Sequence, residues 1–225
     1  MGVSVLREKV KNSHVVWSIL CTLSWICSLN IVLNKNVQLT KADSCMIKSR
    51  ITAKGKGNEI VIEPHTVLRN CKIIITGDNN KLIIHSNVKM INCNIYLTES
   101  QNTVEIGSGT KFAGAADIVA GECSKVTIGE ECLFSKEITI RSYDSHPIYD
   151  MEGDRVNRSK NVNIGNRVWV TQDVKILKGS YIDDGCVLAT GTIITKNFSG
   201  IKESIIAGAP AKVIKDNIRW TSERT

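Results

Sequence analysis

Aliphatic side chains recur at a fixed interval along most of this chain. Ile62, Ile84, Ile106 and Ile128 follow one another at intervals of 22 residues. Three further series keep the same interval: Thr66, Val88, Thr110 and Cys132; Leu68, Met90, Phe112 and Phe134; and Ile74, Tyr96, Ile118 and Ile140. Asparagines repeat as well, at Asn58, Asn80 and Asn102. A repeat of this kind indicates stacked copies of one small structural unit.

In the second half of the chain the interval shortens to six residues. The aliphatic positions there are Ile164, Val170, Ile176, Ile182, Leu188 and Ile194. A chain that buries one aliphatic side chain every six residues forms short strands joined by tight turns, and three such strands close a coil. Stacked coils bury a narrow core and pair their backbone groups with the coils above and below. A sandwich of alternating strands does not predict this register. We therefore predict an all-β parallel β-helix.

The longer interval of 22 residues corresponds to a coil of 18 residues with a four-residue bulge. The bulge falls at one corner each time, around residues 76–80 and 98–102. From Ile118 to Ile128 there are ten residues, whereas from Ile140 to Ile164 there are 24. The difference of 14 predicts a long loop at that same corner, spanning residues 141–160.

Composition limits the choice of partners and compartment. The net charge of +7 would favour an anionic partner, although solubility is the plainer interpretation. Because the chain lacks an aromatic RNA-binding motif and a dense Lys/Arg run, we predict no nucleic-acid partner. The eight cysteines show no CxxC pair and no zinc-ligand spacing. We interpret them as reduced, small buried residues of a cytoplasmic protein.

The N-terminal region differs from the repeat. Residues 15–33 carry no charge and follow Arg7, Lys9 and Lys11. A cleaved signal peptide needs a small-residue cleavage site, but no alanine precedes Ala42. A membrane span needs about 20 apolar residues, and several serine, threonine and asparagine residues dilute this stretch. We favour a helix that lies on a membrane surface or packs on the main domain. The predicted organisation is an N-terminal segment (1–46), a β-helix (47–215) and a C-terminal tail (216–225).

The repeat and two shorter motifs resemble those of a known family. The hexapeptide pattern, covering about residues 47–215, resembles the hexapeptide-repeat acyltransferases, whose fold is a left-handed parallel β-helix. The loop sequence "SYDSHPIYD" resembles the active-site loop of O-acetyltransferases that act on capsules, lipopolysaccharides and small sugars. The resemblance implies that His146 is a general base for an acceptor hydroxyl attacking acetyl-CoA, a role that suits imidazole chemistry. Asp144 or Asp150 could orient the imidazole or bind the acceptor, although a solvated carboxylate is the plainer interpretation.

The second motif runs from "NIGNRVWV" to "AGAPAKVIK" and resembles the coenzyme A track of this family. The resemblance implies that Trp169 lies beside the thioester and the acceptor. It also implies a pantetheine site and a phosphate site, formed respectively by Gln172, Thr190, Thr195 and Lys196, and by Lys212 and Lys215. Because sites of the family lie between subunits, we expect a C3 homotrimer. The thioester is already activated, so we expect neither a covalent intermediate nor a metal.

The sequence thus favours an acetyl-CoA-dependent O-acetyltransferase. We expect its acceptor to be a sugar hydroxyl of a surface polysaccharide or its precursor, with catalysis in the cytoplasm and residues 15–33 suited to contact with the inner face of the membrane. N-acylation of an amino sugar and a non-catalytic β-helix remain alternatives. A zinc-dependent carbonic anhydrase on the same fold needs three converging histidines, and the spacing of His65, His85 and His146 does not predict them.

Overall fold

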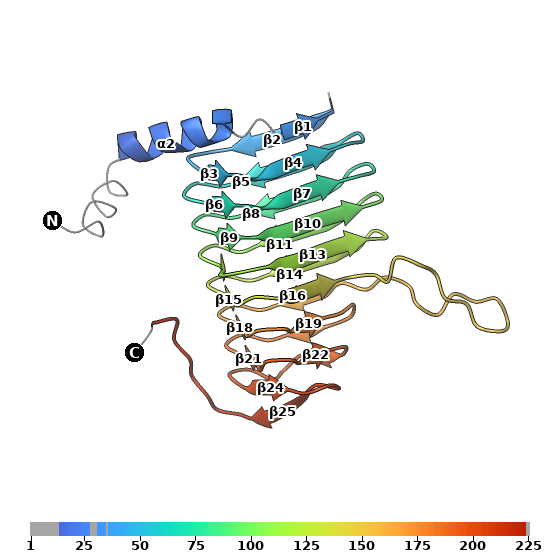
Figure 1. Ribbon diagram of the computed structural model, residues 1–225. Helices are drawn as coiled ribbons and strands as arrows, with labels where there is room; N and C mark the ends of the chain where they lie inside the picture. The colour runs from blue at the N-terminus through green and yellow to red at the C-terminus, as the bar shows by residue number, and fades with distance from the viewer. Residues whose placement is uncertain (1–13, 28–30, 35, 224–225) are drawn as a thin grey trace.

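The computed structural model describes residues 14–27, 31–34 and 36–223. Three parallel sheets form the three faces of a stack of coils (Figure 1). Sheet A contains β1 (Ile31–Leu33), β4 (Arg50–Ala53), β7 (Lys72–Ile75), β10 (Cys93–Thr98), β13 (Ala116–Gly121), β16 (Ile138–Arg141), β19 (Lys175–Ile176) and β22 (Ile193–Ile194). Sheet B contains β2 (Val37–Lys41), β5 (Asn58–Ile62), β8 (Lys81–Ile84), β11 (Thr103–Ile106), β14 (Lys125–Ile128), β17 (Val162–Ile164), β20 (Tyr181–Ile182) and β23 (Asn197–Phe198).

Sheet C contains β3 (Cys45–Ile47), β6 (Val67–Arg69), β9 (Lys89–Ile91), β12 (Lys111–Phe112), β15 (Leu133–Phe134), β18 (Trp169–Val170), β21 (Val187–Leu188), β24 (Ile205–Ala207) and β25 (Lys212–Lys215). The chain passes from A to B to C in every coil, so the solenoid has three edges, named here AB, BC and CA. Only the last pair, β24 and β25, is antiparallel among the described strands. The predicted all-β parallel β-helix is confirmed.

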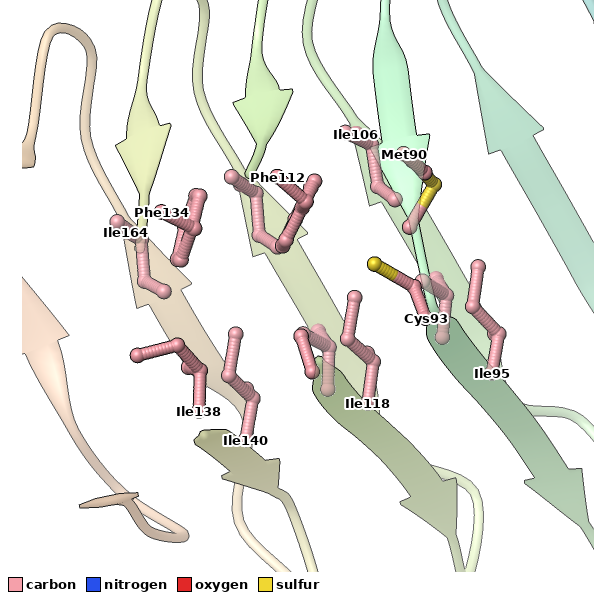
Figure 2. Packing of buried hydrophobic residues seen from close by; sticks show 14 of the residues in the cluster. Met90, Cys93, Ile95, Ile106, Phe112, Ile118, Phe134, Ile138, Ile140 and Ile164 are labelled. Carbon is pink, nitrogen blue, oxygen red and sulfur yellow. The ribbon is translucent and has the colours of Figure 1, made fainter. Parts of the chain in front are cut away.

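The core is the column of aliphatic side chains that the repeat predicted. Ile62, Ile84, Ile106 and Ile128 pair in register on sheet B and are buried. Figure 2 shows side chains from the three sheets pointing toward one another along this column. Phe112 and Phe134 stack on successive coils with their ring centroids 4.3 Å apart. The six-residue series from Ile164 to Ile194 is buried as well.

One predicted series is wrong in part. Ile74 pairs with Tyr96, but Tyr96 pairs with Val119 rather than with Ile118. The buried row of register partners is Ile73, Ile95, Ile118 and Ile140, so Ile74 and Tyr96 face outward. One extra residue at edge CA, between Phe112 and Ala116, lengthens this coil to 23 residues from Cys93 to Ala116.

The N-terminal boundary also differs from the prediction. The first coil begins at Ile31, because β1, β2 and β3 already belong to the three sheets, whereas the sequence placed the start at residue 47. Helix α2 (His14–Cys27) packs against β3. Cys21 is buried there, and Ser24 Oγ accepts a 3.0 Å hydrogen bond from Met46 N. Packing on the main domain is one of the two arrangements that the sequence favoured for this helix. Among the described helical residues, no segment combines the length and hydropathy of a membrane span.

The long insertion lies where the register predicted it. It leaves sheet A after Arg141 and re-enters sheet B at Val162, at the same edge AB that carries the smaller bulges. In Figure 1 it projects far from the stack of coils. The coils before and after it keep their pairing, since Val126 lies opposite Val162 and Ile128 opposite Ile164.

Candidate active site

The insertion is closed at its base by hydrogen bonds between its entrance and its exit. Ser142 O accepts a 3.0 Å bond from Lys160 N. The hydroxyl groups of Ser142 and Ser124 lie 2.6 Å apart, within the buried part of edge AB. Tyr143 is buried against Gly121, where an added Cβ would lie 2.6 Å from the tyrosine ring. Its hydroxyl group lies 2.6 Å from Thr98 Oγ1. The base is therefore rigidly attached to the solenoid, although the insertion projects outward.

His146 lies just beyond the anchored residues Ser142 and Tyr143, and its side chain is exposed. The buried Asn157, on the returning strand of the loop, holds the surrounding backbone. Its Nδ2 donates to His146 O at 2.8 Å and to Asp144 Oδ2 at 3.0 Å. Its Oδ1 accepts from Ile148 N at 2.6 Å. One amide group thus holds the backbone at His146 and Ile148 together with the side chain of Asp144.

Asp144 is held by a lysine from the next coil. Lys178 Nζ donates to Asp144 Oδ2, and to Asn157 O at 2.8 Å. The hydrogen bond from Lys178 lowers the pKa of the Asp144 carboxyl group below its usual value. This carboxylate therefore links the loop to edge AB. Orientation of the imidazole by Asp144 stays a prediction.

The far part of the loop is a short hairpin. Tyr149 and Arg155 pair as an antiparallel bridge. Asp150 Oδ1 accepts from the backbone N–H groups of Glu152 and Asp154, at 3.1 Å and 2.8 Å. Asp150 thus organises the turn, as short acidic side chains commonly do. Four apolar side chains on this hairpin are exposed: Ile148, Tyr149, Met151 and Val156.

A second anchor ties the returning strand to the preceding coil. Arg155 forms an ion pair with Glu122, and both side chains are largely buried. Glu122 also accepts a 3.2 Å bond from Ser159 N and, through its carbonyl oxygen, a 2.8 Å bond from Ser159 Oγ. The loop is therefore braced by the coils on both sides of it.

The other predicted site residues lie on different edges of the solenoid. Gln172 and Thr190 share edge CA, where Gly191 N donates to Gln172 O at 3.1 Å. Thr195 and Lys196 lie at edge AB, and the Lys196 ammonium lies 5.1 Å from the centre of the Phe198 ring. Trp169 lies on the outer face of sheet C, with Lys212 and Lys215 on β25 of the same sheet. Thr195 and Lys196 thus share edge AB with the loop of His146, whereas Trp169, Gln172 and Thr190 do not.

Four residues that matter to the geometry were not predicted from the sequence: Glu122, Asn157, Lys178 and Trp220. Lys178 could have been found, because it stands at the edge AB turn that directly follows the loop in the stack. Asn157 is one polar residue among many in an irregular segment, and the sequence carries no signal for its partners. Trp220 belongs to the tail, outside the repeat. Its ring centroid lies 5.9 Å from that of Trp169.

Comparison with known proteins adds to this geometry. No family model matches the chain. Over 105 residues (46% of the chain), it is 35% identical to the polysialic acid O-acetyltransferase of Escherichia coli O1:K1 / APEC. Over 108 residues (48% of the chain), it is 34% identical to the polysialic acid O-acetyltransferase of Neisseria meningitidis. The chain spans 33% and 50% of the length of these two relatives.

Two solved structures match over most of both chains. The polysialic acid O-acetyltransferase OatWY superposes with a TM-score of 0.82 at 29% identity, covering 88% of this chain and 93% of that one. The polySia-specific acetyltransferase NeuO superposes with a TM-score of 0.77 at 30% identity, covering 87% and 89%.

The stacked hexapeptide coils and this similarity define the class: the chain belongs to the hexapeptide-repeat acyltransferases and has their left-handed parallel β-helix. The predicted family and fold are confirmed. Within the family, polysialic acid O-acetyltransferases are among the relatives that it resembles in both sequence and structure.

Proposed function

We propose that this protein is an acetyl-CoA-dependent O-acetyltransferase that acts on a sugar hydroxyl of a surface polysaccharide or its precursor. The observation that carries the proposal is an exposed histidine on a loop braced from both sides, on a solenoid of this family. The names of the relatives support the reaction and the acceptor class.

In the proposed reaction, a ring nitrogen of His146 removes the proton of the acceptor hydroxyl. The hydroxyl oxygen attacks the thioester carbonyl of acetyl-CoA, and the carbon–sulfur bond then breaks. The imidazolium returns its proton to the departing thiolate. Both products form without a covalent enzyme intermediate. The bracing by Asn157 supports this role, because a general base must be held within hydrogen-bonding reach of its acceptor.

The donor is proposed to lie between subunits of a homotrimer. In a C3 assembly, the His146 loop of one subunit approaches the coenzyme track of its neighbour. That track would consist of Trp169 beside the thioester, Gln172, Thr190, Thr195 and Lys196 along the pantetheine arm, and Lys212 and Lys215 at the phosphates. The exposed apolar hairpin supports this arrangement, since large exposed apolar patches mark contact surfaces.

Contact of α2 with a membrane surface is proposed on similar grounds. Val16, Ile19, Leu20 and Leu23 are exposed, and their spacing places them along one helical face. In the sequence, Arg7, Lys9 and Lys11 precede this helix, and basic residues favour anionic lipid. Flotation with anionic and neutral vesicles tests the contact: Leu20→Glu should abolish flotation, and equal flotation of the variant would refute it. Cytoplasmic localisation stays a prediction.

The proposed reaction is tested by the release of free coenzyme A thiol in the presence of sialic acid polymers. Replacing His146 with alanine should lower kcat on the order of a thousandfold, since general-base catalysis contributes about 10²–10⁴-fold. His65→Ala, at a turn on edge BC, is the matched control. Coenzyme A affinity should stay unchanged in both variants.

Two results would contradict the assignment. Full turnover by the His146→Ala variant would show that His146 is not the general base. Turnover only with amino sugars would replace O-acetylation by N-acylation.

The same assay after treatment with EDTA tests the expected independence from metals, which predicts unchanged turnover. Among the described residues, no group of three His, Cys, Asp or Glu side chains is arranged to hold a metal ion.

A further inference from the structure

The C-terminal tail, residues 216–223, turns back along edge BC instead of leaving the solenoid. Ile218 N donates to Glu203 O at 2.8 Å, and Trp220 Nε1 donates to Arg167 O at 2.8 Å. Trp220 follows Ile218 in the chain but contacts an earlier coil, so the tail runs against the direction of the stack. In Figure 1 the chain rises from β25 beside the coils. The tail therefore forms a wall along edge BC, next to Trp169.

A pocket of about 510 Å³ lies between this wall and the solenoid. The turn positions that line it come from six coils in succession: Asn87, Gly109, Glu131, Arg167, Gly185 and Glu203. Because neighbouring parallel strands lie about 4.8 Å apart, the pocket extends roughly 24 Å along the axis. A groove of this shape fits an extended polymer segment better than a compact small molecule.

The charges along the groove favour an anion. Four basic side chains line it, namely Lys89, Lys111, Arg167 and Arg219, against two acidic ones, Glu131 and Glu203. Arg167 and Glu203 lie 3.7 Å apart and offset each other. Lys89 and Lys111 are register partners on adjacent strands. Both side chains are exposed and lie on the same outward face of sheet C, so one extended anion can contact both.

We propose that this groove, here called the tail groove, binds a stretch of acidic polysaccharide beside the acetyl-transfer site. Carboxylates of the glycan would accept hydrogen bonds from Lys89, Lys111 and Arg219. Trp220 would offer a flat apolar surface to the face of a sugar ring. Since Trp220 lies against Trp169, a chain held in the groove leads to the residue proposed beside the thioester. This inference rests on the proposed function and assigns the acceptor to a defined surface.

The direct test is binding of a carboxylated glycan without acetyl-CoA. Oligosialic acid is the probe, with neutral dextran and coenzyme A as comparison ligands. The Lys89→Gln/Lys111→Gln variant should weaken oligosialic acid binding at least about tenfold, because two charge-assisted contacts are lost. Lys54→Gln/Lys56→Gln removes the same charge at edge AB and should bind as the wild type does. Trp220→Ala should also weaken binding, and dextran should bind to none of them.

Turnover separates this inference from the proposed function. If the wild-type protein binds oligosialic acid through the two lysines but acetylates no glycan, glycan binding in the tail groove is supported and the proposed O-acetyltransferase activity is refuted. If the wild-type protein acetylates the glycan, and the Lys89→Gln/Lys111→Gln variant keeps the same KM and glycan affinity, the proposed activity is supported and glycan binding in the tail groove is refuted. Equal losses in the Lys54→Gln/Lys56→Gln control, or loss of coenzyme A binding alone, would also overturn the tail groove.

Discussion

At the scale of single residues, the position of His146 depends on one buried amide. Asn157 donates to His146 O and to Asp144 Oδ2, so its loss frees the backbone next to the proposed base. We expect Asn157→Ala to lower kcat on the order of tenfold or more, because small misplacements of a catalytic group are costly. Amide exchange at Ile148, which donates to Asn157 Oδ1, should accelerate in the same variant. Asn163→Ala, on the outer face of β17, is the control, and unchanged exchange in Asn157→Ala would contradict the bracing role.

The sequence predicted the histidine but not its support. His146 and Asp144 lie in a motif that resembles a family, and the register placed their loop at one edge. Lys178 stands at a repeat position and could have been found, whereas Asn157 acts through a contact 11 residues away within the loop itself. Contacts of this kind depend on the path of an irregular loop, which has no period. The same reason kept Trp220 out of the predicted site.

At the scale of elements, the strands were predictable wherever one face is apolar and the other polar. In β11 and β14 of sheet B the outward residues, such as Glu105 and Thr127, are polar, and the register of this series was right. In β7 and β10 the outward residues Ile74 and Tyr96 are also large and apolar, so a shift by one residue leaves the pattern intact. The sequence therefore could not locate the extra residue at edge CA. The first coil was missed because β1 continues the apolar run of α2.

The bulges at edge AB are held together by a ladder of buried asparagines. Asn80 Nδ2 donates to Thr76 O and Glu99 O, while its Oδ1 accepts from Asn102 N and Nδ2. We expect Asn80→Ala to lower the free energy of unfolding by about 3 kcal/mol, since several buried backbone groups lose their partner. Asn94→Ala removes an exposed hydrogen bond to Asp117 and should cost less than about 1 kcal/mol. Urea unfolding measures both, and equal losses would contradict the ladder.

A charged clamp crosses four coils on sheet B and at the adjoining edge BC. His85 lies 3.0 Å from Glu63 and 3.2 Å from Glu105, and Glu105 also pairs with Lys125. Burial alone would lower the pKa of His85, but the hydrogen bonds that its ring donates to Glu105 and Glu63 raise this pKa above its usual value of 6.5. The contribution of His85 to stability is therefore complete below pH 6.5 and is lost as the pH rises through the raised value.

The clamp predicts a pH-dependent difference between the wild type and His85→Gln. At pH 5.5, the wild type should be more stable by up to about 1 kcal/mol, because pairs this exposed are partly screened. At pH 9, the difference should shrink. The pKa values of Glu63 and Glu105 are lowered, so both carboxylates stay ionised at the two pH values. Urea midpoints measure the effect, and a difference that grows with pH would show that the sign is wrong.

At the scale of the whole molecule, one chain carries all the predicted groups but separates them. His146 projects from edge AB, whereas Trp169 lies on sheet C. The proposed C3 assembly would resolve this separation, because each loop would then reach the neighbouring solenoid and each chain would serve two sites. The loop is held on its solenoid by the ion pair of Arg155 with Glu122, and its hairpin exposes apolar side chains. Both features suit such a contact between subunits.

Mixed assemblies test this division directly. Trp169→Ala retains the histidine, and His146→Ala retains the tryptophan, so each should be nearly inactive alone. If a site combines His146 of one subunit with Trp169 of the next, coexpression in equal amounts should recover about a quarter of the wild-type rate, since one junction in four then pairs two intact residues. Sedimentation should show a trimer in every sample. If both residues served the same subunit, mixing would only average the two variants. The recovered rate therefore measures whether catalysis is shared across the interface.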